Sequence, residues 1–187
     1  LSNEELSASM SLDRVGRSDC QLDPDKFRWV SQQHLAQQNL QELVRHVRPF
    51  IDRARFPDTG DNLSAVIDTL RTRLSTYNDI NDHLGLLFPE DKVRAELLRK
   101  EVGADPEVNR TLIAVREKLR ALERWEEEGI GTAIREAGTS AGVRGAELFH
   151  PVRRVLIGSE KGPDLGKILV GLGMGEGIRR IDHAIGE

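Results

Sequence analysis

The sequence predicts an all-α protein, a layered assembly of short helices in two helical subdomains. Apolar residues recur at helical spacing in segments that end at glycine, proline or capping residues. No segment shows a convincing strand pattern, in which polar and apolar residues alternate. The composition agrees, because 38% hydrophobic, 4% aromatic and 31% charged residues suit helices with cores of leucine, valine and isoleucine.

The first firmly predicted helix begins after Asp23, a natural N-cap that is followed by a proline in the first turn. Phe27 and Trp29 lie in this helix, and we expect both to be core residues because large aromatic side chains are usually well buried. The preceding stretch, Leu1–Cys20, is polar and has few apolar anchors.

Asn39 is the N-cap of the next predicted helix, which Pro49 ends or kinks. The composition of Phe56–Asp61 (FPDTGD) predicts a loop. A clear amphipathic helix follows from Asp61, and Arg71 and Arg73 lie near its C-terminal end. Cations at that end complement the helix dipole, which is the simplest role for the two arginines.

The segment Phe88–Asp91 breaks the helical pattern and is the candidate boundary between the two subdomains. A helix that ends at Gly103 follows it, and Asp105 caps the next one. We expect a short helix around Ile130–Glu136 and then a connector rich in glycine, alanine and serine at Gly138–Gly145.

The C-terminal part of the chain has the most distinctive pattern. A short apolar segment, Val152–Ile157, directly follows a proline, and Gly158 stops it. A polar loop at Ser159–Asp164 leads into an apolar helix at Leu165–Leu172. Gly173 is placed to close this helix from the left-handed conformation. A helix, a basic loop and a second helix can hold a few polar groups rigidly against a ligand.

Charge and cysteine content limit the classes of function. The net charge of −4 argues mildly against nucleic acid, yet Leu148–Arg180 contains six cations and three anions, a local balance of +3. A single cysteine excludes a disulfide framework and a cysteine-based metal cluster, and is consistent with a reducing cytoplasm. No apolar run approaches membrane-spanning length, so we expect a cytoplasmic protein without a membrane partner.

The sequence contains no convincing catalytic or metal-binding constellation. Gly171–Gly175 is like part of a dinucleotide fingerprint, but no strand precedes it. Gly162–Lys167 is like a phosphate-binding loop, but it is one residue short and Ile168 stands where a Ser or Thr would hold magnesium. The five histidines lack ligand spacing, and no acid–base or nucleophile pair stands out. We therefore predict no catalytic residue and no metal site.

The block from His150 to Ile181 resembles the C-terminal signature of bacterial glutamyl-tRNA synthetases. In that family the signature contains Pro-x-Arg, a Thr-Gly pair, a loop with Ser/Thr-Pro, and an apolar helix that ends in Leu-Leu-Gly. This chain departs at His150, where the family usually has Gln, at Gly162, where it has Ser or Thr, and at Gly166, where it has a bulky residue. The shared residues are Pro151, Arg153, Gly158, Pro163, Leu165, Leu172, Gly173, Arg179 and Arg180.

Other motifs of the same family occur in the same order along the chain. They make the resemblance nearly chain-long, from about Ser11 to Ile181. They are Ser11–Val15, Asp23–Trp29, the Arg-x-Arg segment Arg71–Thr76, the pair Leu87-Phe88, and Trp125.

The resemblance implies the anticodon-binding region of a class I synthetase. The full-length enzyme would ligate glutamate to tRNA(Glu) with ATP and magnesium, from a catalytic domain in the same chain. The class I catalytic signatures are missing here, so this chain should bind tRNA, use no cofactor of its own and be inactive alone, as a monomer. Residues 1–37 would be a remnant of the linker and stem-contact region, and 38–88 and 89–187 the two anticodon-binding subdomains.

The family's anticodon-binding residues map onto seven positions. Arg73 would face the last anticodon base and Arg153 would read the other end of the anticodon. A solvated or helix-capping role is the alternative for both arginines. The remaining positions are three that would line a pocket, Gly162, Pro163 and Leu165, and two neighbouring cations, Arg71 and Lys161.

Two other functions stay open at this point. One is a free-standing RNA-binding paralogue that has lost aminoacylation. The other is a helical scaffold for protein–protein interaction, which a salt-dependent tRNA binding assay would separate from both RNA-binding functions.

Overall fold

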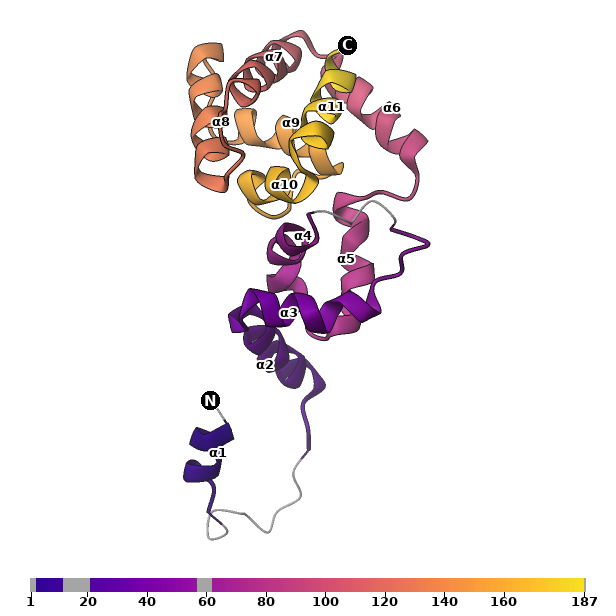
Figure 1. Cartoon of the computed structure of the whole chain (residues 1–187). Helices are drawn as coiled ribbons and strands as arrows, with labels where there is room; N and C mark the ends of the chain where they lie inside the picture. The colour runs from indigo at the N-terminus through magenta and orange to yellow at the C-terminus, as the bar shows by residue number, and fades with distance from the viewer. Residues whose placement is uncertain (1–2, 12–20, 57–61, 187) are drawn as a thin grey trace.

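The computed structural model describes residues 3–11, 21–56 and 62–186, and every regular element in these ranges is helical (Figure 1). The all-α prediction is therefore confirmed. Most of the predicted loop at Phe56–Asp61 and of the motif at Ser11–Val15 lies outside the described residues. Within the described ranges, no helix combines the length and the apolar character needed to cross a membrane.

The helices form two groups that are consecutive in the chain. The first group consists of α1 (Asn3–Ser9), α2 (Pro24–Gln37), α3 (Leu40–Val47), the 3₁₀ turn η2 (Arg48–Phe50), α4 (Leu63–Leu70), the 3₁₀ turns η4 (Arg71–Arg73) and η5 (Tyr77–Asp79), and α5 (Ile80–Leu87). The second group consists of α6 (Lys92–Gly103), α7 (Pro106–Arg120), α8 (Glu127–Ala141), α9 (Ala146–Ile157), α10 (Leu165–Leu172) and α11 (Met174–Ile185).

The predicted helix starts are confirmed by side-chain caps. The carboxylate of Asp23 accepts hydrogen bonds from two backbone N–H groups of α2, at 3.0 and 3.2 Å. Asn39 caps α3 and Asp105 caps α7 in the same way. Each cap satisfies N–H groups that have no partner within the helix, so these local sequence signals fix where the helices begin.

Two predicted boundaries in the second group are wrong. Helix α9 begins at Ala146, so Pro151 lies inside it, where it removes only one N–H from the helix. The expected connector after Glu136 is helical as far as Ala141, and α8 ends at Gly142 with φ 77°. The reason is tertiary contact, because buried Ala133, Ile134 and Ala137 hold this part of α8 in the core.

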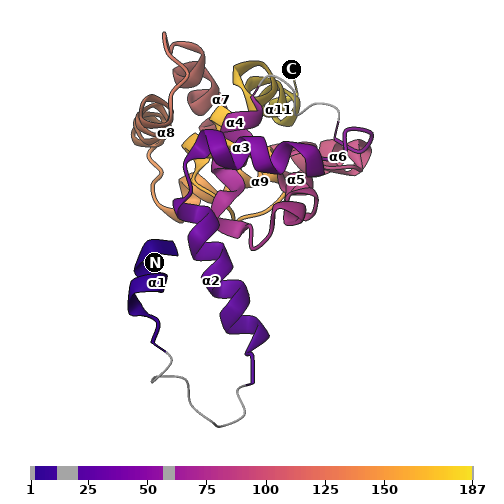
Figure 2. The same ribbon diagram turned by 60° about the horizontal axis from the view of Figure 1, so that its bottom comes forward.

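The prediction that Phe27 and Trp29 are core residues is also wrong. Their exposed fractions are 60% and 59%, and α2 contains no buried residue. Figure 2 shows that α2 projects from the other helices. Only its C-terminal half reaches them, where Leu35 packs against the core and Gln32 bonds to the backbone of η4. The aromatic residues belong to the projecting half, which the described residues leave uncovered.

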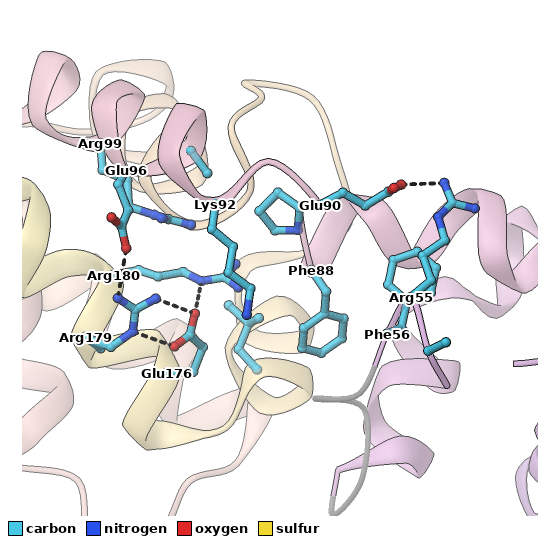
Figure 3. Close-up of a pocket in the computed structure, with 14 residues that line it drawn as sticks. Arg55, Phe56, Phe88, Glu90, Lys92, Glu96, Arg99, Glu176, Arg179 and Arg180 are labelled. Carbon is cyan, nitrogen blue, oxygen red and sulfur yellow. Dashed lines mark hydrogen bonds and ion pairs between the residues drawn. The ribbon is translucent and has the colours of Figure 1, made fainter. Parts of the chain in front are cut away.

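Arg180 of α11 joins the two groups of helices (Figure 3). Its side chain is 3% exposed and donates to the carbonyl oxygen of Leu87 at 2.8 Å and of Leu156 at 2.5 Å. These carbonyls lie at the C-terminal ends of α5 and α9, where carbonyl groups have no hydrogen-bond partner within the helix. The carboxylate of Glu176 accepts a third bond from Arg180, at 2.6 Å. One buried guanidinium therefore satisfies groups from three helices.

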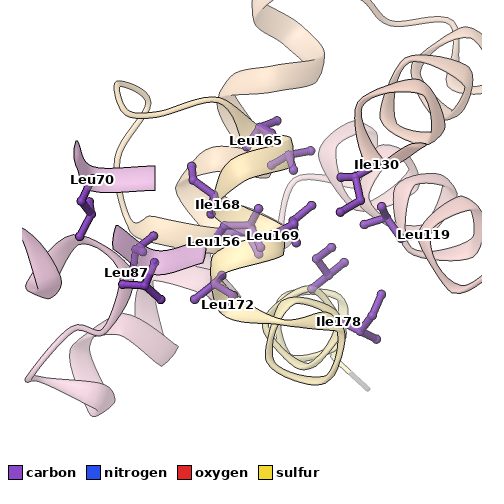
Figure 4. Close-up of a cluster of buried hydrophobic side chains, with 14 of the residues drawn as sticks. Leu70, Leu87, Leu119, Ile130, Leu156, Leu165, Ile168, Leu169, Leu172 and Ile178 are labelled. Carbon is purple, nitrogen blue, oxygen red and sulfur yellow. The ribbon is translucent and has the colours of Figure 1, made fainter. Parts of the chain in front are cut away.

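Helix α10 lies at the centre of the hydrophobic core (Figure 4). It packs against α4 of the first group and against α8, α9 and α11 of the second. Leu70 and Leu87 lie on one side of α10, and Leu119, Ile130 and Ile178 lie on the other. The buried side chains thus form one continuous core across the two groups. The residues that α10 itself contributes are Leu165, Ile168, Leu169 and Leu172.

The predicted closure of this helix is partly right. Gly173 ends α10 with φ 79°, a value that favours glycine, but ψ is 158°, which is not the left-handed helical conformation. Gly173 is also the N-cap of α11, so the chain leaves one helix and enters the next at a single residue.

Replacing Arg180 by Met should strongly destabilise the protein. The carboxylate of Glu176 and the two helix-end carbonyls would lose a buried charged donor, a change that typically costs about 3–5 kcal/mol. Urea denaturation measures the loss. Arg124→Met is the matched control, because the Arg124 side chain is 82% exposed. Equal unfolding midpoints for the two variants would contradict this role of Arg180.

Glu176 should make stability depend on pH in the acid range. Burial opposes its ionisation, but the bonds from Arg179 and Arg180 prevail and lower its pKa from 4.5 to about 2. Because the pKa is lower in the folded state, this stabilisation is complete above pH 4.5 and disappears as the pH falls towards 2. The Glu176→Gln variant should lose this dependence, whereas Glu128→Gln, at an exposed position, should keep it. Unfolding free energies between pH 2 and 7 test this, and identical profiles for the two variants would refute it.

Candidate nucleic-acid interface

The Arg-x-Arg segment forms the turn η4, which directly follows α4. Buried Leu74 ends this turn and anchors it in the core. The side chain of Gln32 donates to the carbonyl oxygen of Thr72 at 2.5 Å, so α2 holds the turn from the other side. The backbone of η4 is therefore fixed at both of its faces.

The two arginines of this turn have different surroundings. Arg71 pairs with Asp68 at 3.2 Å and donates to the carbonyl oxygen of Gln38, so its guanidinium is held within the protein. Arg73 is exposed and makes no hydrogen bond or ion pair with any described residue. Of the two, Arg73 has the guanidinium that a ligand can reach.

The chain beyond η4 is fixed by a capping box around η5. The carboxylate of Asp79 accepts from the backbone N–H of Ser75 at 2.8 Å and of Thr76 at 2.9 Å. The hydroxyl of Thr76 donates to the same carboxylate at 2.6 Å. Burial alone would raise the pKa of Asp79, but these bonds to the ionised form lower it. Hydrogen bonds thus hold both ends of the Arg71–Thr76 segment, from Gln32 of α2 at one end and with Asp79 at the other.

The polar loop after Gly158 folds back on α9. Arg153 Nη1 donates to the carbonyl oxygen of Glu160 at 2.9 Å. The Glu160 carboxylate lies 3.6 Å from His150 Nδ1 and 3.8 Å from Arg154 Nη1. The Ser159 hydroxyl donates to the carbonyl oxygen of Lys161 at 2.9 Å, which tightens the turn. Arg153 is half-buried under this loop, and its Nε has no hydrogen-bond partner within the described structure.

The remaining predicted residues lie along the same loop and the start of α10. Lys161 is exposed, and Gly162 and Pro163 are half-buried. Leu165 is 3% exposed, so its side chain belongs chiefly to the core. The structure therefore places Arg153 of α9 against the loop that contains Lys161, Gly162 and Pro163, and it places Arg73 on a separate turn.

Asp68 links these two places, and sequence reasoning missed it. Its carboxylate pairs with Arg71 beside η4 and with Lys167 of α10 at 3.1 Å. Beside it, the hydroxyl of Thr69 lies 2.9 Å from the carbonyl oxygen of Lys167. Asp68 has an ordinary position on an amphipathic helix, so only its partners reveal this role. Sequence reasoning also missed the role of Glu160, because only its partners His150 and Arg154 reveal it.

With this geometry in place, comparison with known proteins identifies the family. Residues 42–185 match the family described as anticodon binding domain, and this span contains both η4 and the loop after Gly158.

The chain belongs to the anticodon-binding domain family.

Curated relatives of this family member are glutamate–tRNA ligases. The ligase of Desulforudis audaxviator is 32% identical over 190 residues, which are 97% of this chain and 38% of the ligase. A ligase of Fervidobacterium nodosum is 27% identical over 182 residues, which are 97% of this chain and 36% of that protein. The chain thus spans well under half the length of these relatives.

The fold of this chain matches part of a solved structure. The crystal structure of a glutamate tRNA ligase from Elizabethkingia meningosepticum, in complex with its amino acid, superposes with a TM-score of 0.76. The match covers 99% of this chain and 36% of that one at 21% sequence identity. At this identity the likeness establishes the fold alone.

The six cations between Leu148 and Arg180 do not form one patch. Arg180 is buried, Arg179 pairs with Glu176 and Glu96, and Lys167 pairs with Asp68. The cations that stay beside the loop are Arg153, Arg154 and Lys161.

Two departures from the family signature have a steric explanation. A Cβ atom at Gly162 would lie 2.7 Å from Cδ1 of Ile157 and 3.4 Å from Cδ of Arg153. Ile157 stands where the signature has Thr, so its extra methyl group occupies the space beside Gly162. A Cβ atom at Gly166 would lie 2.8 Å from the backbone oxygen of Glu127. A side chain at position 166 would collide with backbone, whereas a side chain at position 162 would require the Ile157 Cδ1 methyl group to rotate away.

The contact between Gly162 and Ile157 predicts non-additive effects of substitution. Gly162→Ser should destabilise the protein by about 0.5–1.5 kcal/mol, because the Ile157 side chain must leave its preferred rotamer to make room. Ile157→Val removes the Cδ1 methyl group and should cost about 0.5–1.5 kcal/mol alone. The double variant should be more stable than the sum of the two losses predicts. Urea denaturation of all four proteins measures the coupling, and strict additivity would contradict the steric explanation.

Proposed function

We propose that this chain is the anticodon-binding part of a glutamate–tRNA ligase and that its partner is tRNA(Glu). The observation that carries the proposal is the family match over residues 42–185, which contains both the exposed Arg73 and the loop that holds Arg153. Curated relatives that are glutamate–tRNA ligases support the choice of tRNA.

The chemistry of an anticodon loop suits these arginines. The loop presents unstacked bases whose Watson–Crick edges can be read by side chains. A guanidinium offers a rigid planar fork of donors and a face that stacks on bases. In this proposal Arg73 contacts the last base of the anticodon, and Arg153 with Lys161, Gly162 and Pro163 contacts the first.

We also propose a division of labour along the chain. Residues 38–88 and 89–187 hold the anticodon from two sides, and residues 1–37 lead towards the part of the enzyme that contacts the acceptor stem. Asp68 pairs with Arg71 and with Lys167 and so helps to fix the position of the two sides relative to each other. Leu165 supports the binding loop from within the core, and Arg71 holds η4 in place.

The complete enzyme would ligate glutamate to tRNA(Glu) in the cytoplasm, as a monomer whose separate catalytic domain uses ATP and magnesium. The described residues contain no group of three or more His, Cys, Asp or Glu that could hold a metal ion. No step of the ligation is therefore assigned to this chain. We propose that it forms no glutamyl-adenylate by itself, which ATP–pyrophosphate exchange measures directly.

Arg73 gives the proposal its specificity. Glutamate anticodons end in C and glutamine anticodons end in G. Cytosine offers acceptors at N3 and O2, whereas guanine offers donors at N1 and N2. Because arginine has only donors, it pairs with both N3 and O2 of C, whereas at G it faces donors at N1 and N2 and only O6 can accept from it. A mismatch that leaves polar groups unpaired costs about 1–3 kcal/mol, which is roughly a tenfold to hundredfold preference.

Competitive binding of anticodon stem-loops that differ only in the last base tests this function. The chain should prefer C over G by about tenfold or more, and Arg73→Gln should lose the preference because glutamine has both a donor and an acceptor. Arg153→Ala should weaken binding of both stem-loops by roughly 1–3 kcal/mol. Arg124→Gln is the control, since this exposed arginine lies on the loop between α7 and α8. Equal affinity of the unaltered chain for C and G would rule out the role of Arg73.

A further inference from the structure

A cavity of about 770 Å³ lies where α6 and α11 meet the segment between α5 and α6 (Figure 3). Charged side chains of α6 and α11 line one side of it, and Phe56 and Phe88 lie on the other. None of the seven predicted anticodon-binding residues lines this cavity. The predicted anticodon-binding site therefore does not explain the charged residues that line this cavity.

Arg99 is the unusual group in the cavity. It comes from α6 and is 4% exposed, and its Nε donates to the carbonyl oxygen of Val155 at 2.9 Å. Its Nη1 and Nη2 atoms have no hydrogen-bond partner among the described residues, and no carboxylate there forms an ion pair with it. A guanidinium has five N–H donors, and no described residue accepts a hydrogen bond from the four on Nη1 and Nη2.

The acidic residues nearby are already engaged with other cations. Glu176 binds Arg179 at 2.7 Å and Arg180 at 2.6 Å. Glu96 lies 3.6 Å from Arg179, and Glu90 pairs with Arg55 at the far side of the cavity. The whole lining has five cations, Arg55, Lys92, Arg99, Arg179 and Arg180, against three carboxylates, Glu90, Glu96 and Glu176.

The pKa of Arg99 agrees with this excess of cations over carboxylates in the lining of the cavity. The pKa of Arg99 is lowered to about 10, first by burial and then by the positive charge of Arg180. Arg99 is still charged at neutral pH. The cavity thus combines a positive field with donors that the described part of the protein does not use, which is the environment that an oxyanion requires.

We propose that this cavity binds the terminal phosphate or pyrophosphate group of a small phosphorylated ligand, with Arg99 as its bidentate contact and Lys92 as a second cation. A guanidinium fork matches two oxygens of a phosphate group. A terminal phosphate has one substituent and can reach the buried Arg99. An internal RNA phosphate has a ribose on both sides and would have to bring both into the cavity. Phe88 and Pro89 form an apolar wall for the rest of the ligand.

Direct binding of inorganic pyrophosphate and orthophosphate to the purified chain tests the proposal. Isothermal titration calorimetry should show saturable binding at one site. Arg99→Lys keeps the charge but removes the fork, and it should weaken binding by about tenfold to hundredfold. Lys92→Glu, at an exposed position, should weaken binding by about fivefold. Arg124→Lys, away from the cavity, should bind as the unaltered chain does.

Two further measurements keep the outcome decisive. Melting temperatures of all variants show whether each one folds, and if Arg99→Lys does not fold, Lys92→Glu alone decides the test. Absence of saturable binding to the unaltered chain would overturn the proposal, as would variants in the cavity that bind like the Arg124→Lys control. If Arg99→Lys weakened binding of an RNA stem-loop but not of pyrophosphate, the site would belong to RNA and the proposal would be wrong.

Discussion

The burial of α10 is the constraint on which the rest of the structure depends. An isolated eight-residue helix is unstable in water, so its stability comes from packing. Side chains of both helical groups surround it, and Trp125 donates to its Leu169 carbonyl oxygen at 2.9 Å. The loop that holds Arg153 leads directly into α10, and Lys167 of α10 binds Asp68 beside η4. Fixing this one helix therefore fixes both parts of the candidate interface.

The charges of the chain are divided between stability and binding. Arg180 is buried to bond the ends of α5 and α9, and Arg71 and Lys167 meet at Asp68. Arg73 and Lys161 remain exposed. Counting charge along a sequence does not make this distinction, because an arginine that satisfies helix ends and one that faces solvent count equally. A chain with a net charge of −4 can therefore still present cations where an RNA loop would bind.

The departures from the family signature are best understood in pairs. Gly162 is small where Ile157 is large, and Gly166 is small where the backbone of Glu127 comes close. In each pair the sequence shows only a missing side chain, while the structure shows what fills the space.

The sequence by itself determined the helical class and the caps at Asp23, Asn39 and Asp105, since these depend on residues close together in the chain. It also determined the family, because the family's motifs follow one another in order along the chain. It also placed Arg73 and Arg153 in their segments. Only the tertiary structure decided that Pro151 lies within a helix, that Phe27 and Trp29 are exposed, and that Asp68 pairs with both Arg71 of η4 and Lys167 of α10. The physical reason is that burial and ion pairing depend on residues far apart in sequence, such as Lys167 and Asp68, which no local pattern brings together.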